Sequence, residues 1–90
     1  MWIKLFYYLY FTMKKPFNRI PPLDLHGITY KDVQVLVEDY VLMNQAYLPL
    51  QIITGNSQSM KNRVIKALKE HGFRYRIGDT FNKGYILVIS

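Results

Sequence analysis

The stretch Leu23-Asp24-Leu25-His26-Gly27 decides how this sequence folds, because it joins an apolar alternation to a glycine that ends it. In a β-strand, successive side chains point to opposite faces of the sheet. A strand over residues 23–26 would therefore bury both leucines on one face and place the acid and the imidazole together on the other. The stretch predicts a strand that carries an acid and a base on one surface.

The residues before this stretch divide into an aromatic segment and a linker. Residues 1–13 are apolar and aromatic, but a membrane span takes about 20 apolar residues. They could pack on the domain, lie on a membrane surface, or form a leader ahead of a true start at Met13. Three prolines within residues 16–22 favour a linker. We therefore expect residues 1–22 to precede a single domain that spans residues 23–90.

A first helix is expected soon after Gly27. Thr29 is suited to its N-cap, and Asp32 three residues later forms a weak variant of the capping box. The acids of this helix fall outside its apolar face and are expected to be solvated. The apolar residues recur at the spacing of one helical face: Val33, Leu36, Val37, Tyr40 and Val41.

A second helix is expected from Ser57 or Ser59 to His71, with Gly72 as a suitable C-terminal stop. Its apolar side would hold Met60, Val64, Ala67, Leu68 and His71. Its polar side would hold Lys61, Asn62, Arg63, Lys66 and Lys69. A basic helix face of this kind serves solubility more often than binding.

Three further strands are predicted over residues 48–54, 73–77 and 85–89. The order strand, helix, strand, helix, strand, strand indicates an α/β fold. Crossover connections of this length favour parallel neighbours, and the short final loop favours an antiparallel hairpin. We expect a two-layer sandwich in which a four-stranded mixed sheet carries two helices on one face.

Composition adds a basic balance and the absence of cysteine. The 90-residue chain has 12 Lys and Arg against 6 Asp and Glu, for a net charge of +6. A basic surface favours phosphate-rich partners such as nucleic acid. The lack of cysteine excludes a disulfide scaffold and thiolate chemistry, and it favours an intracellular compartment.

A second loop of interest is Thr54-Gly55-Asn56-Ser57, which lies between a predicted strand and a helix. Ligands collect at the carboxyl ends of parallel strands, and a helix N-terminus offers free N–H groups to a phosphate. If the first two strands are close neighbours, this loop and His26 converge. The alternative is that Gly55 serves only a tight turn and Ser57 only caps the helix.

The alternation of residues 73–77 places Arg74 and Arg76 outward. If the helices cover the other face, these arginines share the open face with Asp24 and His26. The imidazole is suited to proton transfer near neutral pH, and a carboxylate can orient it. An acid and a histidine two residues apart also occur together by chance, so an incidental pair is the alternative.

Other catalytic classes find little support in the sequence. Asp24 and His26 could supply two ligands to a metal, but no convincing third ligand is visible. The nucleophile motif of serine hydrolases is missing. The glycines match neither a dinucleotide-binding motif nor a P-loop.

The opening motif, the stretch Ile52-Ile53-Thr54-Gly55 and the ending Gly84-Tyr85-Ile86-Leu87-Val88 together resemble the Smr (small MutS-related) domain. The resemblance covers residues 22–90 and is closest to short stand-alone forms from bacteriophage genomes. It implies a fold similar to the C-terminal domain of bacterial translation initiation factor three. It also implies an endonuclease that nicks DNA or cleaves RNA, including messages on stalled ribosomes.

The resemblance also implies roles for individual residues. Asp24 and His26 match the acid and histidine that are the catalytic candidates of the family. Lys61 or Arg63 would contact phosphate early in the second helix. One departure is that many Smr domains have Gly-x-Gly in the second loop, where this chain has Ser57 in place of the second glycine.

The leading hypothesis is a cytoplasmic endonuclease without stable membrane association. Asp24 and His26 would be catalytic. RNA cleavage through the 2′-hydroxyl would need no metal, and a divalent metal is an option otherwise. One alternative is a non-catalytic module that binds nucleic acid or a ribosome, and a third is a membrane-surface protein. The predicted contacts to nucleic acid are Thr54, Gly55, Asn56, Ser57, Lys61, Arg63, Arg74 and Arg76.

Overall fold

The computed structural model describes residues 20–90. The predicted aromatic segment and most of the predicted linker fall in residues 1–19, outside the described residues. The described chain forms, in order, β1 (Leu23–Asp24), α2 (Tyr30–Met43), the 3-10 helix η1 (Gln45–Tyr47), β2 (Leu50–Ile53), α3 (Gln58–Glu70), β3 (Tyr75–Ile77) and β4 (Tyr85–Val88).

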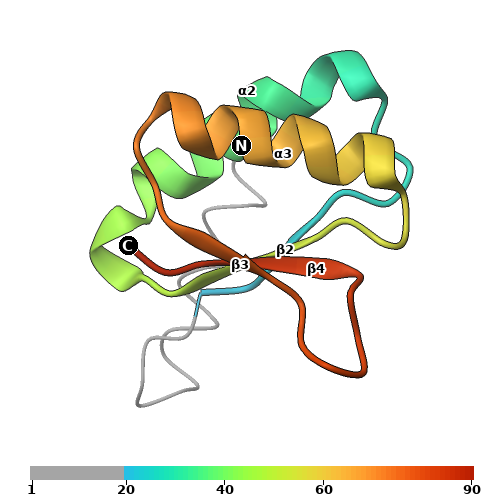
Figure 1. Ribbon diagram of the computed structural model, residues 1–90. Helices are drawn as coiled ribbons and strands as arrows, with labels where there is room; N and C mark the ends of the chain where they lie inside the picture. The colour runs from blue at the N-terminus through green and yellow to red at the C-terminus, as the bar shows by residue number, and fades with distance from the viewer. Residues whose placement is uncertain (1–19) are drawn as a thin grey trace.

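Both long helices lie on the same side of a four-stranded mixed sheet, as Figure 1 shows. The predicted two-layer α/β sandwich is therefore confirmed. The predicted helical stripes and the alternating strand residues meet between the two layers, where burial of apolar surface stabilises the fold. The buried core consists of Leu25, Val33, Val37, Tyr40, Val41, Leu50, Ile52, Met60, Val64, Ala67, Leu68, Ile86 and Val88.

The strand order in the sheet is β1-β2-β4-β3. β1 pairs with β2 in parallel, with Asp24 opposite Ile53, and β4 is antiparallel to both of its neighbours. The expectation of parallel neighbours is confirmed for β1 and β2 and wrong for β2 and β3, which β4 separates. The inward residues Ile86 and Val88 of β4 are fully buried, as a central strand requires.

Thr29 occupies the N-cap position of α2, as predicted, but its side chain makes no capping hydrogen bond to a backbone N–H. Its hydroxyl instead donates to the Asp32 carboxylate over 2.9 Å. Ser57 caps α3, because its Oγ accepts the Met60 N–H over 3.1 Å. The two predicted helix starts are thus confirmed in position, although only the second has the side-chain cap.

Two predictions for this helix are wrong: Lys61 of α3 is buried, and His71, its C-cap residue, is exposed. Lys61 is only 8% exposed, because it precedes Val64 by three residues and so belongs to the apolar face. His71 is exposed rather than packed in the core, and its Nε2 lies 2.9 Å from a Glu38 carboxylate oxygen. This contact holds the pKa of Glu38 below its ordinary value and links α3 to α2.

The turn between β3 and β4 depends on Gly78, whose φ is +52°. A Cβ added there would collide with the backbone carbonyl oxygen of Asn82. At Gly72, after α3, φ is +74° but an added Cβ would meet nothing within 4 Å.

Replacing each glycine by alanine separates backbone strain from collision. Gly72→Ala is expected to lower the free energy of unfolding by about 1–2 kcal/mol, the cost of a left-handed alanine. Gly78→Ala should cost clearly more, because the turn backbone must also move. Denaturant unfolding of both variants measures the difference, and equal losses would contradict the predicted collision.

Candidate functional site

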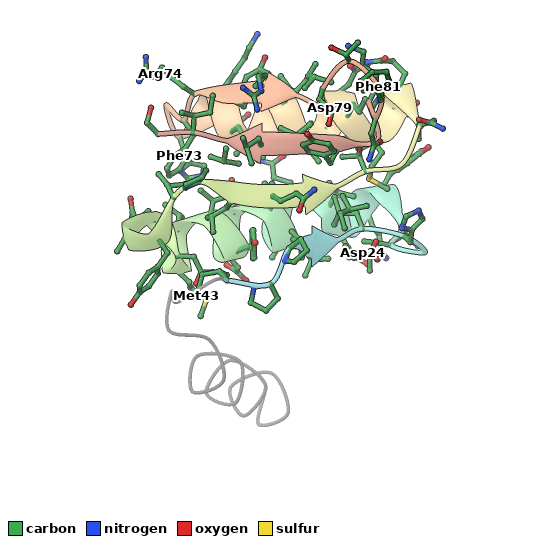
Figure 2. All side chains as sticks on the ribbon, turned by 90° about the horizontal axis from the view of Figure 1, so that it is seen from below. Asp24, Met43, Phe73, Arg74, Asp79 and Phe81 are labelled. Atoms are coloured by element: carbon green, nitrogen blue, oxygen red, sulfur yellow. The ribbon has the colours of Figure 1, made fainter. Side chains whose placement is uncertain are left out.

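Three loops meet where the parallel strands β1, β2 and β3 end. We call this region the carboxyl edge and define it by residues 25–29, 54–57 and 78–84. In Figure 2, Asp24, Asp79 and Phe81 lie toward one end of the sheet, and Arg74 lies at the opposite end. Ligand sites in α/β sheets form outside the carboxyl ends of the strands. The carboxyl edge is therefore the candidate functional site of this fold.

Backbone hydrogen bonds join the three loops. The Leu25 N–H donates to the Ile53 carbonyl over 3.0 Å, which ties the first loop to the end of β2. The Gly84 carbonyl accepts the N–H groups of both Thr54 and Gly55, each over 2.9 Å. The predicted convergence of the first and second loops is therefore observed, and the hairpin loop joins them.

The first loop is held by the Asp24 side chain, which accepts the backbone N–H of His26. The strand ends at Asp24, so the prediction that it extends to His26 is wrong. The chain turns instead, with Gly27 at a φ of +76° and the Ile28 N–H bonded to the Leu25 carbonyl over 3.1 Å. The tight turn suits glycine at this position, and it moves His26 from the open sheet face to the carboxyl edge.

Asp24 and His26 nevertheless form a pair. One carboxylate oxygen of Asp24 accepts the His26 N–H over 2.9 Å and lies 2.7 Å from His26 Nδ1. The side chains are 57% and 69% exposed, respectively, so the pair is open to a ligand. The backbone N–H first, and the imidazole second, hold the pKa of Asp24 below its ordinary value of 3.8. The carboxylate is ionised at neutral pH and fixes the ring.

This contact also decides which ring nitrogen is free. An ionised carboxylate only accepts hydrogen bonds, so Nδ1 of His26 must carry the proton that it shares with Asp24. The lone pair of the neutral ring is then at Nε2. A carbon atom placed on Gly55 would lie 3.5 Å from Nε2, so this nitrogen adjoins the second loop. A proton acceptor therefore lies beside the loop that opens into α3.

The second loop is fixed from both sides. Gly55 has a φ of +68°, and Ser57 Oγ lies 3.3 Å from the Tyr30 hydroxyl as well as capping α3. The Arg63 guanidinium lies 4.8 Å from the centre of the Tyr30 ring, a cation–π distance. A shallow hollow of about 440 Å³ lies here, lined by Gly27, Ile28, Thr29, Tyr30, Ser57 and Met60.

The predicted contacts within this loop differ in their availability. Thr54 is buried, and its hydroxyl donates to the Gly55 carbonyl over 3.0 Å, so it does not face a ligand. Asn56 is exposed. The N–H groups of Gln58 and Ser59 fall in the first turn of α3, where a helix provides them no carbonyl partner. The positive end of the helix dipole therefore points toward this edge.

The two predicted arginine contacts do not join the site. Arg74 donates from Nε to Ser90 Oγ over 2.7 Å, at the opposite end of the sheet. Arg76 shares the open face with Asp24, as the alternation predicts, but β2 and β4 lie between them. Three strand spacings separate these two residues by about 14 Å across the sheet, and the register offsets them by two further positions along the strands. Of the four side chains that were expected to lie together, only the Asp24 carboxylate and the His26 imidazole are in contact.

The third loop, residues 78–84, is part of the site, although its sequence predicts only a turn. The Asp79 carboxylate accepts the N–H groups of Phe81 over 2.8 Å and Asn82 over 2.6 Å, and the Tyr85 hydroxyl over 3.1 Å. These bonds, that of Asn82 first, lower the pKa of Asp79. The Asp, Asn and Gly residues of this loop indicate a turn, but no local pattern places it beside the second loop, to which Gly84 joins it.

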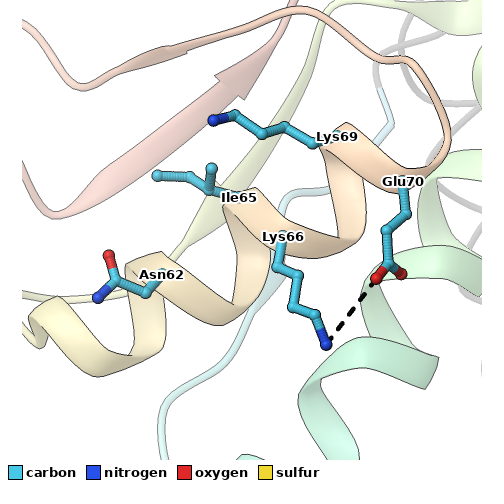
Figure 3. Close-up of a pocket in the computed structure, with 5 residues that line it drawn as sticks. All are labelled: Asn62, Ile65, Lys66, Lys69 and Glu70. Carbon is cyan, nitrogen blue, oxygen red and sulfur yellow. Dashed lines mark ion pairs between the residues drawn. The ribbon is translucent and has the colours of Figure 1, made fainter.

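A second hollow, of about 500 Å³, lies along α3 and is lined by Asn62, Ile65, Lys66, Lys69 and Glu70 (Figure 3). Lys66 lies 3.8 Å from the Glu70 carboxylate, so part of its charge is compensated. No histidine is among the residues that line this hollow. Over residues 20–90, no cluster of three or more His, Cys, Asp or Glu side chains is arranged to hold a metal ion.

The pKa of Asp24 gives a test of the pair. The carboxyl group is expected to titrate below 3.8, and in His26→Ala to remain below 3.8 because the N–H of residue 26 still donates. The folded state favours the ionised carboxylate of Asp24. The resulting contribution to the free energy of unfolding is present at neutral pH and is lost as the pH falls through the lowered pKa. Carboxyl-carbon NMR measures both values, and a wild-type pKa at or above 3.8 would contradict the geometry.

Comparison with known proteins adds no family to this description. No family model matches the chain, and neither a curated protein nor a solved structure matches it. In the described part of the chain, no helix has both the length and the apolar character that a membrane crossing requires. The function is therefore inferred from the geometry of the carboxyl edge.

Proposed function

We propose that the protein is a nucleic-acid endonuclease with its catalytic site at the carboxyl edge. The observation that carries this proposal is the Asp24–His26 pair, in which a 2.7 Å contact to Nδ1 leaves Nε2 free beside Gly55. A histidine held by a carboxylate is a common general base. The start of α3 supplies N–H groups and a dipole suited to phosphate at the same place.

RNA is the substrate that this pair suits best. His26 Nε2 takes the proton of the ribose 2′-hydroxyl, and the resulting oxygen attacks the neighbouring phosphorus. The bond from phosphorus to the 5′-oxygen breaks, and the leaving oxygen takes a proton from a water molecule. The hydroxide so formed takes the proton from His26, which returns the ring to its neutral form. The products are a 2′,3′-cyclic phosphate and a 5′-hydroxyl. DNA lacks the 2′-hydroxyl, so its nicking would need another nucleophile, and a divalent metal could then activate water.

Phosphate binding would draw on fewer residues than the sequence indicated. The first-turn N–H groups of α3, exposed Asn56 and Arg63 remain as contacts near His26. Arg63 is the cation best placed for this, because its cation–π contact with Tyr30 holds it beside the hollow next to Ser57. The net charge of +6 favours the approach of a polyanion in general.

The proposal agrees with the resemblance of residues 22–90 to Smr domains. The departure from Gly-x-Gly at Ser57 does not strain the loop, since its φ is −74° and no left-handed residue is needed there. Its hydroxyl is occupied by the N–H of Met60. A phosphate could therefore approach the loop, although less closely than over a second glycine. A cytoplasmic location fits an RNA substrate.

Substitution of the histidine tests the chemistry. His26→Ala is expected to lower RNA cleavage by about 10²- to 10⁴-fold, the contribution of a positioned general base. His71→Ala is the matched control, because His71 also contacts a carboxylate but lies between α2 and α3. Gel analysis of labelled RNA measures the rate, and mass spectrometry of the product ends should find the cyclic phosphate.

Two results would count against this assignment. Equal cleavage by wild type and His26→Ala would remove His26 from the chemistry. Tight binding without cleavage by wild type would instead support a non-catalytic module for nucleic acid or ribosomes. Asp24→Asn refines the role of the acid, since asparagine can still accept the His26 N–H but carries no charge to stabilise a protonated ring.

Salt dependence tests the phosphate contact. Arg63→Ala is expected to flatten the slope of log affinity against log salt by about 0.7 to 0.9, the loss of one phosphate contact. Arg74→Ala is the control and should leave the slope unchanged, because Arg74 lies at the other end of the sheet and bonds to Ser90. Fluorescence anisotropy with labelled RNA measures both slopes, and the reverse order of effects would contradict the assigned interface.

A further inference from the structure

We propose that Phe81 is a stacking platform for an unpaired base of the substrate, so that the protein acts on single-stranded or looped nucleic acid. This inference rests on the proposed nuclease function and names the class of substrate. It begins from the exposure of Phe81, whose side chain is 96% exposed at the tip of the hairpin between β3 and β4. A large apolar side chain this exposed adds nothing to the core.

The loop that carries Phe81 is held in place. Asp79 accepts the N–H of Phe81 and that of Asn82, and the Asn82 side chain accepts the Gly84 N–H over 2.8 Å. The Gly78 N–H closes the base of the loop by donating to the Tyr85 carbonyl over 2.8 Å. Hydrogen bonds therefore restrain the backbone that carries the exposed ring of Phe81. A ring on a restrained loop loses less conformational freedom when a base stacks on it than a ring on a flexible loop would.

The Phe81 ring lies toward the same end of the sheet as the proposed catalytic pair (Figure 2). Phe81 precedes Gly84 by three residues, which span at most about 11 Å. Gly84 accepts the N–H of Gly55, and Gly55 adjoins Nε2 of His26. Figure 2 places Phe81 and Asp24 toward the same end of the sheet. A strand whose phosphate lies at His26 could therefore place a neighbouring base on the ring.

The charges around Phe81 favour a nucleic acid. Lys83 is exposed in the same loop and can meet a backbone phosphate. The only acid of the loop, Asp79, has its carboxylate occupied by two backbone N–H groups and the Tyr85 hydroxyl. Its charge is thus partly compensated. An aromatic ring beside a cation is the usual combination at sites that bind single strands.

Stacking on Phe81 distinguishes unpaired from paired substrate. In a duplex, both faces of an internal base are covered by its neighbours, so the ring can stack only after a base leaves the helix. In a single strand or a loop, the base face is free. The inference therefore predicts a preference that phosphate contacts alone would not produce.

Binding is best measured in the His26→Ala background, so that RNA is not cleaved during the titration. In this background, Phe81→Ala and Phe81→Leu are expected to weaken binding of single-stranded RNA by about 5- to 100-fold, the range for one base–aromatic stack. Phe81→Tyr should bind like the parent, because it keeps the ring. The same strand annealed to its complement should show little change in any variant.

A tryptophan at the same position reports the contact directly. Phe81→Trp fluorescence is expected to be quenched when single-stranded RNA is added, because the indole stacks on a base. Tyr47→Trp is the matched control, since Tyr47 is also exposed, at 49%, but lies in η1 before the start of β2. The natural Trp2 is common to both variants, and the signal of the parent protein can be subtracted.

The outcomes separate this inference from the nuclease proposal. If Phe81→Leu binds like the parent, or all variants lose single-strand and duplex binding equally, stacking is wrong while cleavage through His26 can stand. Quenching at Tyr47→Trp but not at Phe81→Trp would also overturn it. If the wild-type protein neither binds nor cleaves RNA or DNA, the nuclease proposal and the stacking inference both fail.

Discussion

The carbonyl of Gly84 accepts two N–H groups, those of Thr54 and Gly55, and this shared acceptor holds the carboxyl edge together. It joins the hairpin loop to the loop before α3, while the parallel pairing of β1 with β2 brings the first loop, residues 25–29, to the same place. The arrangement is available because β4 lies between β2 and β3, so the start of β4 adjoins the end of β2. Without this strand order, the hairpin loop would lie away from His26.

The same few groups serve both folding and the proposed chemistry. The Asp24 carboxylate closes a turn by accepting the His26 N–H, and the same oxygen orients the imidazole. Ser57 caps α3, and Tyr30 contacts Ser57 while it holds Arg63 by a cation–π contact. The exposed acid–base pair gains little stability from its charges. Its geometry is maintained by the turn, so the ring orientation does not depend on a buried ion pair.

The sequence predicted the layers of the fold well, because each layer depends on a local period. The helical stripe and the strand alternation correctly assigned Val33, Val37, Val64 and most of the core. The prediction that Lys61 lies on the polar face is wrong, because its spacing from Val64 places it on the buried side of α3 despite its charge. The order of the strands was not predicted, since nothing local states which strand the final hairpin will pair with.

The candidate site could be predicted only where it depends on residues close together in the sequence. Asp24 and His26 are only two residues apart in sequence, so their contact depends on a single turn. The arginines were expected beside them because alternation fixes a face, but alternation says nothing of position along the sheet or across it. Arg74 and Arg76 therefore share the predicted face without sharing the site. Phe81 lies toward the same end of the sheet as Asp24 (Figure 2) only through the tertiary pairing of the strands, which local patterns do not encode.

We propose that nucleic acid binds at the carboxyl edge, and chemical-shift mapping can locate the bound strand on the protein. A single-stranded RNA with 2′-O-methyl groups, which lacks the attacking hydroxyl, can be titrated into isotope-labelled protein. We expect shifts of the backbone amides in residues 26–29, 55–59 and 80–84 together. Shifts concentrated at Arg74 and Ser90, or along the exposed side of α3 at Lys66 and Lys69, would contradict binding at the carboxyl edge.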